Sequence, residues 1–468
     1  MPSAAKRLRV GISGAGIGGL TLALTLSQYP DIDVDLFEAS KSLQEVGAGV
    51  AVFPRPWKIL RLLGVDQELL KTCDVKPKEG PGQATRSPMP QAKVYQCLQS
   101  SIAKAISLWA YRFRRSSPMA RSMITLHRAE FQSALLGRLP KTCRIHYSKR
   151  LRSFDQQQSG PIELAFEDGS RATCDVLVGA DGLKSATRAA LLTERVSWMQ
   201  SQGRPDEAAD AAECIEPWWS GQIAYRAVIP AERLRKVSPG HPALTQPLQY
   251  LGKRGFVMAY PISQGKMVNF AAFTMRHDLE NTKYDAPWMG PADKSHFAGL
   301  FADWEPDVQA LVHCVENPLS WAVHTVKPLR SFVCGRVVLI GDAAHAMTPQ
   351  QGSGAGQALE DAYILGLLLG HSSTNIHTLG RSLNAFDQVR RPRAQQVARV
   401  SRLAARYFTF EIDGVGVDFS ADFGHPAAGS NPVGWETLQR LHHEVVKNWE
   451  WAWNTSVDES IQEALSML

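Results

Sequence analysis

The stretch Leu8-Arg-Val-Gly-Ile-Ser-Gly14-Ala-Gly16-Ile-Gly-Gly19 lies near the start of this 468-residue chain and decides its fold. Residues 7–13 are largely apolar and predict a short buried strand, while the Leu-, Thr- and Ala-rich residues 18–28 predict a helix. Residues 34–38 read as a second strand. Strand, glycine turn, helix and strand in this order predict a βαβ unit, and therefore a parallel sheet.

The three glycines of this Gly-x-Gly-x-x-Gly pattern have separate mechanical roles. Gly14 permits a tight turn, Gly16 lets the backbone approach a pyrophosphate, and Gly19 lets the helix pack closely on the strand. The N-terminus of the helix offers N–H groups to a diphosphate. Glu38 ends the second strand, where its carboxylate can accept the ribose hydroxyls of NAD or FAD. The alternative interpretation is a glycine-rich turn that binds no ligand.

Composition and charge exclude several classes of protein. Hydrophobic residues make up 44% of the chain and charged residues 21%, as in an ordinary folded protein. The net charge of +6 is mild and the basic residues are mixed with acidic ones, so we expect no nucleic-acid partner. The 7 cysteines include no Cys-x-x-Cys pair, which favours free thiols in a reducing compartment. Because the chain enters a strand without a signal-peptide pattern, we expect a cytoplasmic location.

Residues 10–30 carry no charged side chain and are long enough to cross a bilayer. They contain several glycines and begin like a strand, so a buried strand, turn and helix explain them better than a membrane span. We therefore predict no membrane span.

The middle of the chain predicts a second sheet. Residues 221–229, 255–262 and 266–274 have strand character with loop residues between them, which indicates an antiparallel sheet. Residues 145–154 read as one strand, and residues 176–179 as a buried strand before an acidic glycine turn.

Three motifs stand in one order along the chain. The glycine pattern with Glu38 is followed by Gly179-Ala-Asp181-Gly182-x-x-Ser185-x-x-Arg188, and then by Gly341-Asp342-Ala-Ala-His345-x-x-x-Pro349. Together they resemble the single-component FAD-dependent aromatic hydroxylases, the flavoprotein monooxygenases of the salicylate hydroxylase and para-hydroxybenzoate hydroxylase type. The resemblance runs from about residue 8 to about residue 400.

The resemblance implies an α/β fold with a Rossmann-like parallel-sheet FAD domain, an inserted antiparallel-sheet substrate domain and a helical C-terminal region. The expected boundaries are 1–75, 120–200 and 325–400 for the discontinuous FAD-binding domain, 76–119 for a connecting segment, 201–324 for the substrate domain and 401–468 for the C-terminal helices. The nucleotide domain would thus be assembled from segments far apart in the sequence.

The resemblance also assigns residues to the cofactor. Gly49, in Gly47-Ala-Gly49, is similar to a loop that lets the flavin swing, and Pro349 with the backbone of residues 352–355 matches the segment under the isoalloxazine. The family usually has Gln where Ser353 stands and Asn where Gly356 stands. The residues expected to contact FAD are Gly14, Gly16, Gly19, Glu38, Gly49, Arg128, Asp181, Asp342, Gly354 and Ala355.

The chemistry implied by the resemblance is carried by cofactors. NAD(P)H reduces the flavin, O2 adds to give a C4a-hydroperoxyflavin, and a phenolic aromatic attacks its terminal oxygen. With a single dinucleotide pattern in the chain, we expect NAD(P)H to bind transiently. The sequence shows no nucleophile elbow and no His and Cys spacing typical of a metal site, so no metal is predicted.

The substrate is expected between the flavin and the antiparallel sheet. Alternation along residues 222–227 puts Gln222, Ala224 and Arg226 on one face and Tyr225 on the other. Arg226 could bind a carboxylate or stabilise a phenolate; the alternative is a surface or interdomain arginine. Substrate-binding candidates are Gln222, Tyr225, Arg226 and Asn269, and catalytic candidates are Arg226, Tyr260 and Pro349.

The preferred partner is a small phenolic or aromatic acid of the hydroxybenzoate type, with decarboxylation left open, bound by a monomer or homodimer. The alternatives are an FAD-dependent epoxidase, a kynurenine-type monooxygenase, a flavin-dependent halogenase and a non-catalytic FAD redox protein. Trp449-Glu-Trp451-Ala-Trp453 is faintly similar to a halogenase motif, but it lies at the far C-terminus and reads as helix packing or a dimer surface.

Overall fold

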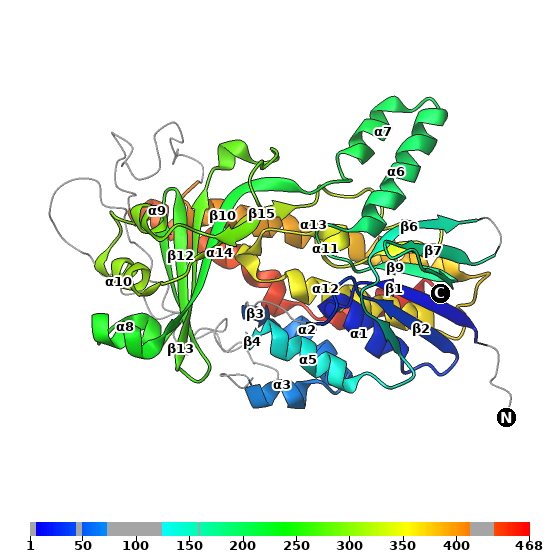
Figure 1. Cartoon of the computed structure of the whole chain (residues 1–468), viewed down its shortest axis with the longest axis horizontal. Coiled ribbons are helices and arrows are strands. Elements are labelled where there is room, and N and C mark those ends of the chain that lie inside the picture. The colour runs from blue at the N-terminus through cyan, green and yellow to red at the C-terminus, as the bar shows by residue number, and fades with distance from the viewer. Residues whose placement is uncertain (1–5, 44–48, 73–123, 158–159, 412–434) are drawn as a thin grey trace.

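The computed structural model describes residues 6–43, 49–72, 124–157, 160–411 and 435–468 (Figure 1). The predicted connecting segment 76–119, the loop 413–434, and residues 47 and 48 of the proposed flavin loop lie outside the described residues. The five described cysteines are all free.

A six-stranded sheet in the order β16-β17-β9-β1-β2-β5 forms the nucleotide-binding half, and all its pairs except β16–β17 are parallel. Its strands are β1 (Leu8–Ser13), β2 (Ile32–Phe37), β5 (Arg144–His146), β9 (Val176–Gly179), β16 (Val333–Cys334) and β17 (Val337–Leu339). The helices beside it are α1 (Ile17–Leu26), α2 (Pro54–Leu62), α3 (Asp66–Thr72), α5 (Arg128–Arg138), α11 (Asp342–His345) and α12 (Gly354–Gly370). The parallel sheet predicted for the start of the chain is confirmed.

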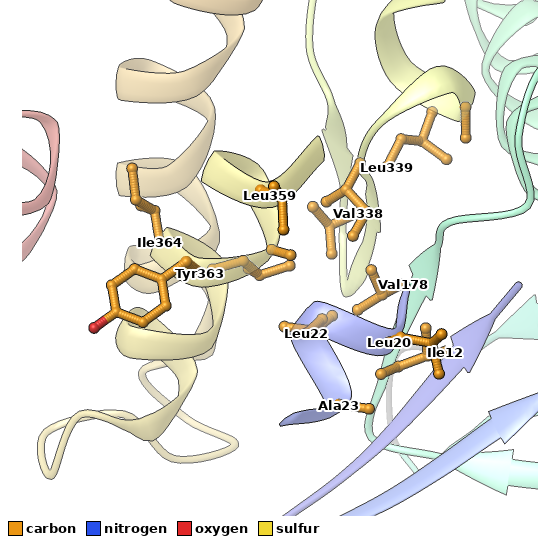
Figure 2. Close-up of a cluster of buried hydrophobic side chains, with 14 of the residues drawn as sticks. Ile12, Leu20, Leu22, Ala23, Val178, Val338, Leu339, Leu359, Tyr363 and Ile364 are labelled. Atoms are coloured by element: carbon orange, nitrogen blue, oxygen red, sulfur yellow. The ribbon is translucent and has the colours of Figure 1, made fainter. Parts of the chain in front are cut away.

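Its core lies where α1 and α12 pack against the sheet (Figure 2). Ile12 of β1 and Val178 of β9 face Leu20 of α1, and Leu359 of α12 lies beside Val338 of β17. All five side chains are buried. Strands from residues 8 and 337 therefore meet in one core, which makes this half of the molecule discontinuous in sequence.

Two smaller sheets connect these elements. β3 (Gly49–Val52) pairs with β4 (Ile124–His127), and β6 (Leu151–Gln156), β7 (Ile162–Phe166) and β8 (Arg171–Cys174) form a three-stranded sheet. The single strand predicted over residues 145–154 is wrong, because β5 and β6 belong to different sheets. The helices α6 (Ala186–Ser201) and α7 (Pro205–Ala212) form a hairpin that projects from the body (Figure 1).

An antiparallel sheet in the order β11-β12-β13-β10-β15-β14 forms the other half. Its strands are β10 (Trp218–Pro230), β11 (Leu248–Gly252), β12 (Gly255–Ile262), β13 (Met267–Met275), β14 (Met289–Pro291) and β15 (Leu319–Thr325). The three predicted strands are present, and β11, β14 and β15 are additional. The 13-residue strand β10 lies at its centre, between β13 and β15.

The two faces of this sheet bury different cores. One face packs on α8 (Ala231–Val237), α9 (Lys294–Gly299) and α10 (Pro306–Cys314), through residues such as Tyr225 and Phe297. The other packs on α13 (Leu379–Phe408) and α14 (Trp435–Asn454), through residues such as Ala224, Phe273 and Phe408. The second face is turned toward the nucleotide-binding half (Figure 1).

The chain ends in α13, α14 and α15 (Val457–Ser466). The expected fold class, with a parallel FAD-type sheet, an antiparallel sheet and a helical C-terminus, is confirmed. The domain boundaries stay a prediction. Among the helices within the described ranges, none is long and apolar enough to span a membrane.

A buried ionic cluster holds α12 in place. Arg55 of α2 binds both carboxylate oxygens of Glu360 at 2.9 and 2.8 Å, and Arg390 of α13 binds Glu360 at 2.9 Å and Asp361 at 2.8 Å. His345 lies 2.5 Å from Asp361. Burial acts to raise the pKa of the Asp361 carboxyl, but the charges of His345 and Arg390 outweigh it and the pKa is lowered. These five side chains, each at most 3% exposed, tie four helices together.

Replacing Glu360 with Gln should destabilise the protein. The substitution keeps the side-chain shape but leaves Arg55 and Arg390 buried with one counter-charge fewer, which typically costs about 3–5 kcal/mol. We expect a loss of that size in the free energy of unfolding measured with urea. Glu68→Gln, which breaks an exposed pair with Lys71, is the control and should change it by less than about 0.5 kcal/mol. Equal losses in the two variants would contradict the role of the cluster.

Candidate active site

The glycine turn after β1 is shaped by close backbone contacts. Gly14 has a φ of +105°, and a Cβ added to it would lie 2.4 Å from the carbonyl oxygen of Ala180. A Cβ on Gly19 would lie 1.9 Å from the carbonyl oxygen of Gly14. Neither position can hold a side chain without moving the backbone, so α1 begins close against the end of β1.

Gly16 differs from its neighbours, because a Cβ placed on it would meet nothing within 4 Å. Gly16 is the N-cap of α1, and its φ of −69° is open to any residue. Packing within the protein therefore does not require glycine here. A missing side chain beside open space at a helix N-terminus fits the close approach of a diphosphate.

Glu38 lies beside this turn. Its carboxylate accepts hydrogen bonds from the backbone N–H groups of Ala15 and Ser40, both at 2.8 Å. The buried Gln132 of α5 donates to the carbonyl oxygen of Ala15 at 2.9 Å and fixes the turn from the other side. Glu38 is thus held next to the glycine turn, and its contact with a ribose stays a prediction.

Asp181 has a structural role in its own turn. Its carboxylate accepts hydrogen bonds from Ser185 Oγ at 2.5 Å and from the N–H and Oγ1 of Thr187 at 3.0 and 2.9 Å. The buried Arg188 donates to three carbonyl oxygens, including that of Ala343. Asp181 therefore stabilises the start of α6 beside Gly14, and its contact with FAD stays a prediction.

The segment before α12 presents a second helix N-terminus. The short 3-10 helix η3 (Pro349–Gln351) ends at Gly352, whose φ of +58° is left-handed, and α12 starts at Gly354. Asp342 is exposed, and its Oδ1 lies 4.0 Å from a Cβ built on Gly354. Gly352, Gly354 and Ala355 are only partly buried. Backbone N–H donors and an exposed carboxylate thus converge here, an arrangement that fits the ribityl chain and ring of a flavin.

The strand register brings several substrate candidates to one face. Tyr260 of β12 lies opposite Asn269 of β13, and Asn269 lies opposite Val228 of β10. Arg226 is two residues before Val228 and therefore shares its face. This face is the one turned toward the nucleotide-binding half.

Direct contact joins this face to the proposed flavin loop. A Cβ on Gly49, the first residue of β3, would lie 2.5 Å from the hydroxyl of Tyr260 and 3.9 Å from Oδ1 of Asn269. Gln350 of η3 donates to Oε1 of the buried Gln222 at 2.8 Å. The fold thus makes neighbours of candidates from two distant segments. Gly49 is more than 200 residues before Tyr260 and Asn269 in the sequence.

Among the described residues, no carboxylate contributes to the electrostatic surroundings of Arg226. Burial lowers the pKa of its guanidinium, the neighbouring Tyr260 acts to raise it, and the positive charge of Arg128 lowers it further. The guanidinium lies 5.7 Å from the ring centre of Trp321. Burial also raises the pKa of the Tyr260 phenol, against the effect of Arg226. Arginine stays protonated, so the guanidinium of Arg226 and the protonated phenol of Tyr260 favour an anionic ligand.

Tyr225 does not join this group. Its ring packs 5.3 Å from that of Phe297, in the core on the opposite face of the sheet. The alternation of β10 requires this, because Tyr225 and Arg226 are adjacent. The assignment of Tyr225 as a substrate-binding residue is corrected accordingly.

Trp321 and Gln350 are site residues that were not predicted from the sequence. Trp321 lies on β15, a strand that was not predicted, although the alternation of Leu319-Ser-Trp-Ala-Val-His-Thr325 was a usable signal. Gln350 stood beside the proposed Pro349, but no local pattern indicated that it would meet Gln222. No group of three or more potential metal ligands occurs among the described residues.

The chain matches a family model described as "FAD binding domain" over residues 7–212 and 311–401. A salicylate hydroxylase of Pseudomonas putida is 32% identical over 467 residues, covering 98% of this chain and 95% of the relative. A 6-methylsalicylate 1-monooxygenase of Aspergillus terreus is 30% identical over 427 residues, covering 87% and 85%. A solved structure titled as a salicylate hydroxylase substrate complex superposes with a TM-score of 0.76 at 28% identity, covering 98% of both chains.

Gly16→Val should separate ligand binding from folding. Because a side chain at Gly16 meets no protein atom within 4 Å, we expect the melting temperature of the apo-protein to stay nearly unchanged. The same side chain would occupy the space of the diphosphate, so we expect FAD to bind at least tenfold more weakly, or about 1.4 kcal/mol. FAD titration of the apo-protein measures this.

Gly137→Val is the matched control, because Gly137 also has nothing within 4 Å of a built Cβ but lies on the exposed side of α5. This variant should bind FAD normally. If Gly16→Val also binds FAD normally, the diphosphate does not lie at the N-terminus of α1.

Proposed function

This chain belongs to the single-component FAD-dependent aromatic hydroxylases, and on that premise we propose that it hydroxylates a phenolic carboxylate of the hydroxybenzoate type with NAD(P)H and O2. The observation that carries the proposal is Arg226. It is the cationic member of a face that also holds Tyr260 and Asn269 and lies against β3. A phenolic acid matches this arrangement, because its carboxylate can pair with a guanidinium while its ring lies against the flavin.

The activities for which the relatives are named support the same class. One acts on salicylate and another on 6-methylsalicylate, and both compounds are aromatic rings with a carboxylate and a phenolic hydroxyl. In the second name, position 1 is the ring carbon that bears the carboxyl group. We infer that oxygen enters this chain's substrate at that carbon. The bond from the ring to the carboxylate then breaks, its electron pair stays with the ring, and CO2 leaves.

The residues have distinct proposed roles. Bound FAD supplies the redox chemistry, in which NAD(P)H provides two electrons and O2 provides one oxygen atom to the ring and one to water. Arg226 holds the carboxylate and sets which ring carbon faces the flavin. Tyr260, whose raised pKa keeps it protonated, donates a hydrogen bond to an anionic oxygen of the substrate. In this proposal Asn269 hydrogen-bonds the same group.

Water exclusion depends on the contact between the two halves of the molecule. Gln222 and Gln350 pair across it, and Tyr260 covers the backbone of Gly49. Both contacts hold one face of the sheet against β3 and η3. A dry site of this kind strengthens the pairing of Arg226 with a carboxylate.

A panel of hydroxybenzoates should identify the substrate. We expect salicylate and its ring-substituted analogues to stimulate NAD(P)H oxidation, and product mass to show loss of CO2 with gain of one oxygen. Stimulation without loss of CO2 would contradict oxygen insertion at the carboxyl-bearing carbon. Absence of stimulation by every phenol would sink the hydroxybenzoate proposal, and chloride dependence would point to halogenation.

Arg226→Met should raise KM for salicylate about tenfold to a hundredfold, because a buried charge-assisted hydrogen bond contributes about 1.5–3 kcal/mol. The same variant should leave KM for salicylamide nearly unchanged, since that analogue has no carboxylate. Arg233→Met is the control within the same sheet region, because Arg233 pairs with Glu316 at 2.8 Å on the surface. An equal KM effect on salicylate and salicylamide would mean that Arg226 does not bind the carboxylate.

A further inference from the structure

The tryptophan-rich helix α14 makes a specific contact with the segment that precedes α12. Nε1 of Trp451 donates to Oε1 of Gln351 at 3.0 Å, and Nε2 of Gln351 donates to the carbonyl oxygen of Asn448 at 2.8 Å. Gln351 is fully buried, at 0% exposure. Both ends of its amide are therefore bonded to α14, and we call this pair of hydrogen bonds the Gln351 clasp.

Other contacts make the clasp part of a rigid assembly. The backbone N–H of Gln351 donates to Ser401 Oγ at 3.2 Å, and Nδ2 of Asn448 donates to the carbonyl oxygen of Val400 at 2.8 Å. Ser401 and Val400, which are adjacent on α13, thus bind η3 and α14 respectively. A displacement of α14 would therefore also displace η3, because hydrogen bonds join the two segments directly.

The same helix also packs on the strand that bears Gly49. The ring of Trp449 lies 5.3 Å from that of Phe53, the residue that follows β3, and Ala452 completes this small buried cluster. A Cβ on Gly352 would lie 3.3 Å from Ala51 Cβ and 4.0 Å from Phe53 Cε2. α14 therefore supports both sides of the proposed flavin ring site: β3 on one side and residues 349–352 on the other.

We infer that α14 positions the flavin-facing backbone, and that the hydrogen bond from Trp451 to Gln351 tunes the electron affinity of the bound flavin. Trp451 and Gln351 are positioning residues in this inference, acting through the N–H donors of residues 352–355. It rests on the proposed placement of the flavin ring at the N-terminus of α12, and it is independent of the substrate.

The physical basis is the distance dependence of electrostatic stabilisation. Reduction adds negative charge at the N1 and C2 carbonyl edge of a flavin, and donors held in place beforehand stabilise that charge. Loss of the Trp451 donor leaves a fully buried amide oxygen of Gln351 without a partner. The η3 segment then has to shift before this oxygen can accept a hydrogen bond from another donor. The backbone N–H groups of residues 352–355, which follow η3, move with it.

Trp451→Phe tests the inference, with Trp453→Phe as a matched control. Both variants replace the indole ring of a tryptophan on α14 by the phenyl ring of phenylalanine. Trp453 Nε1 has no hydrogen-bond partner among the described residues, so only the first variant removes a bond. The measurement is the midpoint potential of enzyme-bound FAD without substrate or NAD(P)H, together with the flavin absorption spectrum and the melting temperature.

We expect Trp451→Phe to make reduction of the bound flavin about tenfold less favourable, which lowers the midpoint potential by about 30 mV for a two-electron couple. Trp453→Phe should leave the potential unchanged, even where it lowers the melting temperature. Equal shifts in the two variants, or no shift in Trp451→Phe, would overturn the inference.

Gln351→Met provides a second test of the inference, and as a single variant it does not require Trp451→Phe to be isolated. It removes both bonds of the clasp and should lower the potential at least as far, and adding Trp451→Phe to it should then cause little further change. Additive shifts in the double variant would overturn the inference. The potential is measured without substrate, so its result does not depend on whether the proposed substrate class is correct. Conversely, an unchanged potential in these variants would not affect the assay of hydroxybenzoate turnover.

Discussion

The position of α12 is the constraint on which the rest of the candidate site depends. Its N-terminus is the end that we propose faces the flavin, and its second turn carries Glu360 and Asp361 into the middle of the protein, where an unpaired carboxylate would be costly. Arg55, Arg390 and His345 reach them from three other helices. This pairing fixes the helix along its axis as well as sideways. The donors at its N-terminus are therefore held in place before any ligand binds.

Two sheets with different roles meet at that helix end. One face of the antiparallel sheet lies against β3 and η3, and the contacts from Tyr260 to Gly49 and from Gln350 to Gln222 join them. α14 extends the connection, since Leu441 packs in the core below the antiparallel sheet while Trp449 packs on the strand end next to the flavin segment. Packed side chains of α14 thus join the antiparallel sheet to the end of β3.

Electrostatics divides the site into two parts. Helix N-termini and open backbone at the glycine turn favour the phosphates and the ring edge of the flavin. Farther along, the positive charge of the partly buried Arg226 favours an anionic group. The mild net charge of +6 suits these acidic ligands without the dense basic surface that a nucleic acid requires.

The sequence by itself determined the βαβ unit, the order of the three motifs and the face of β10 that carries Arg226, because each depends on residues close together in the chain. It also placed Gly49, Tyr260 and Asn269 among the candidates, but only the tertiary structure made them neighbours. The contact of Gln351 with Trp451, the buried ionic cluster and the turn of Tyr225 into the opposite core were decided by packing. Such contacts join residues 16 to 305 positions apart, and local periodicity carries no information about which distant surface a side chain will meet.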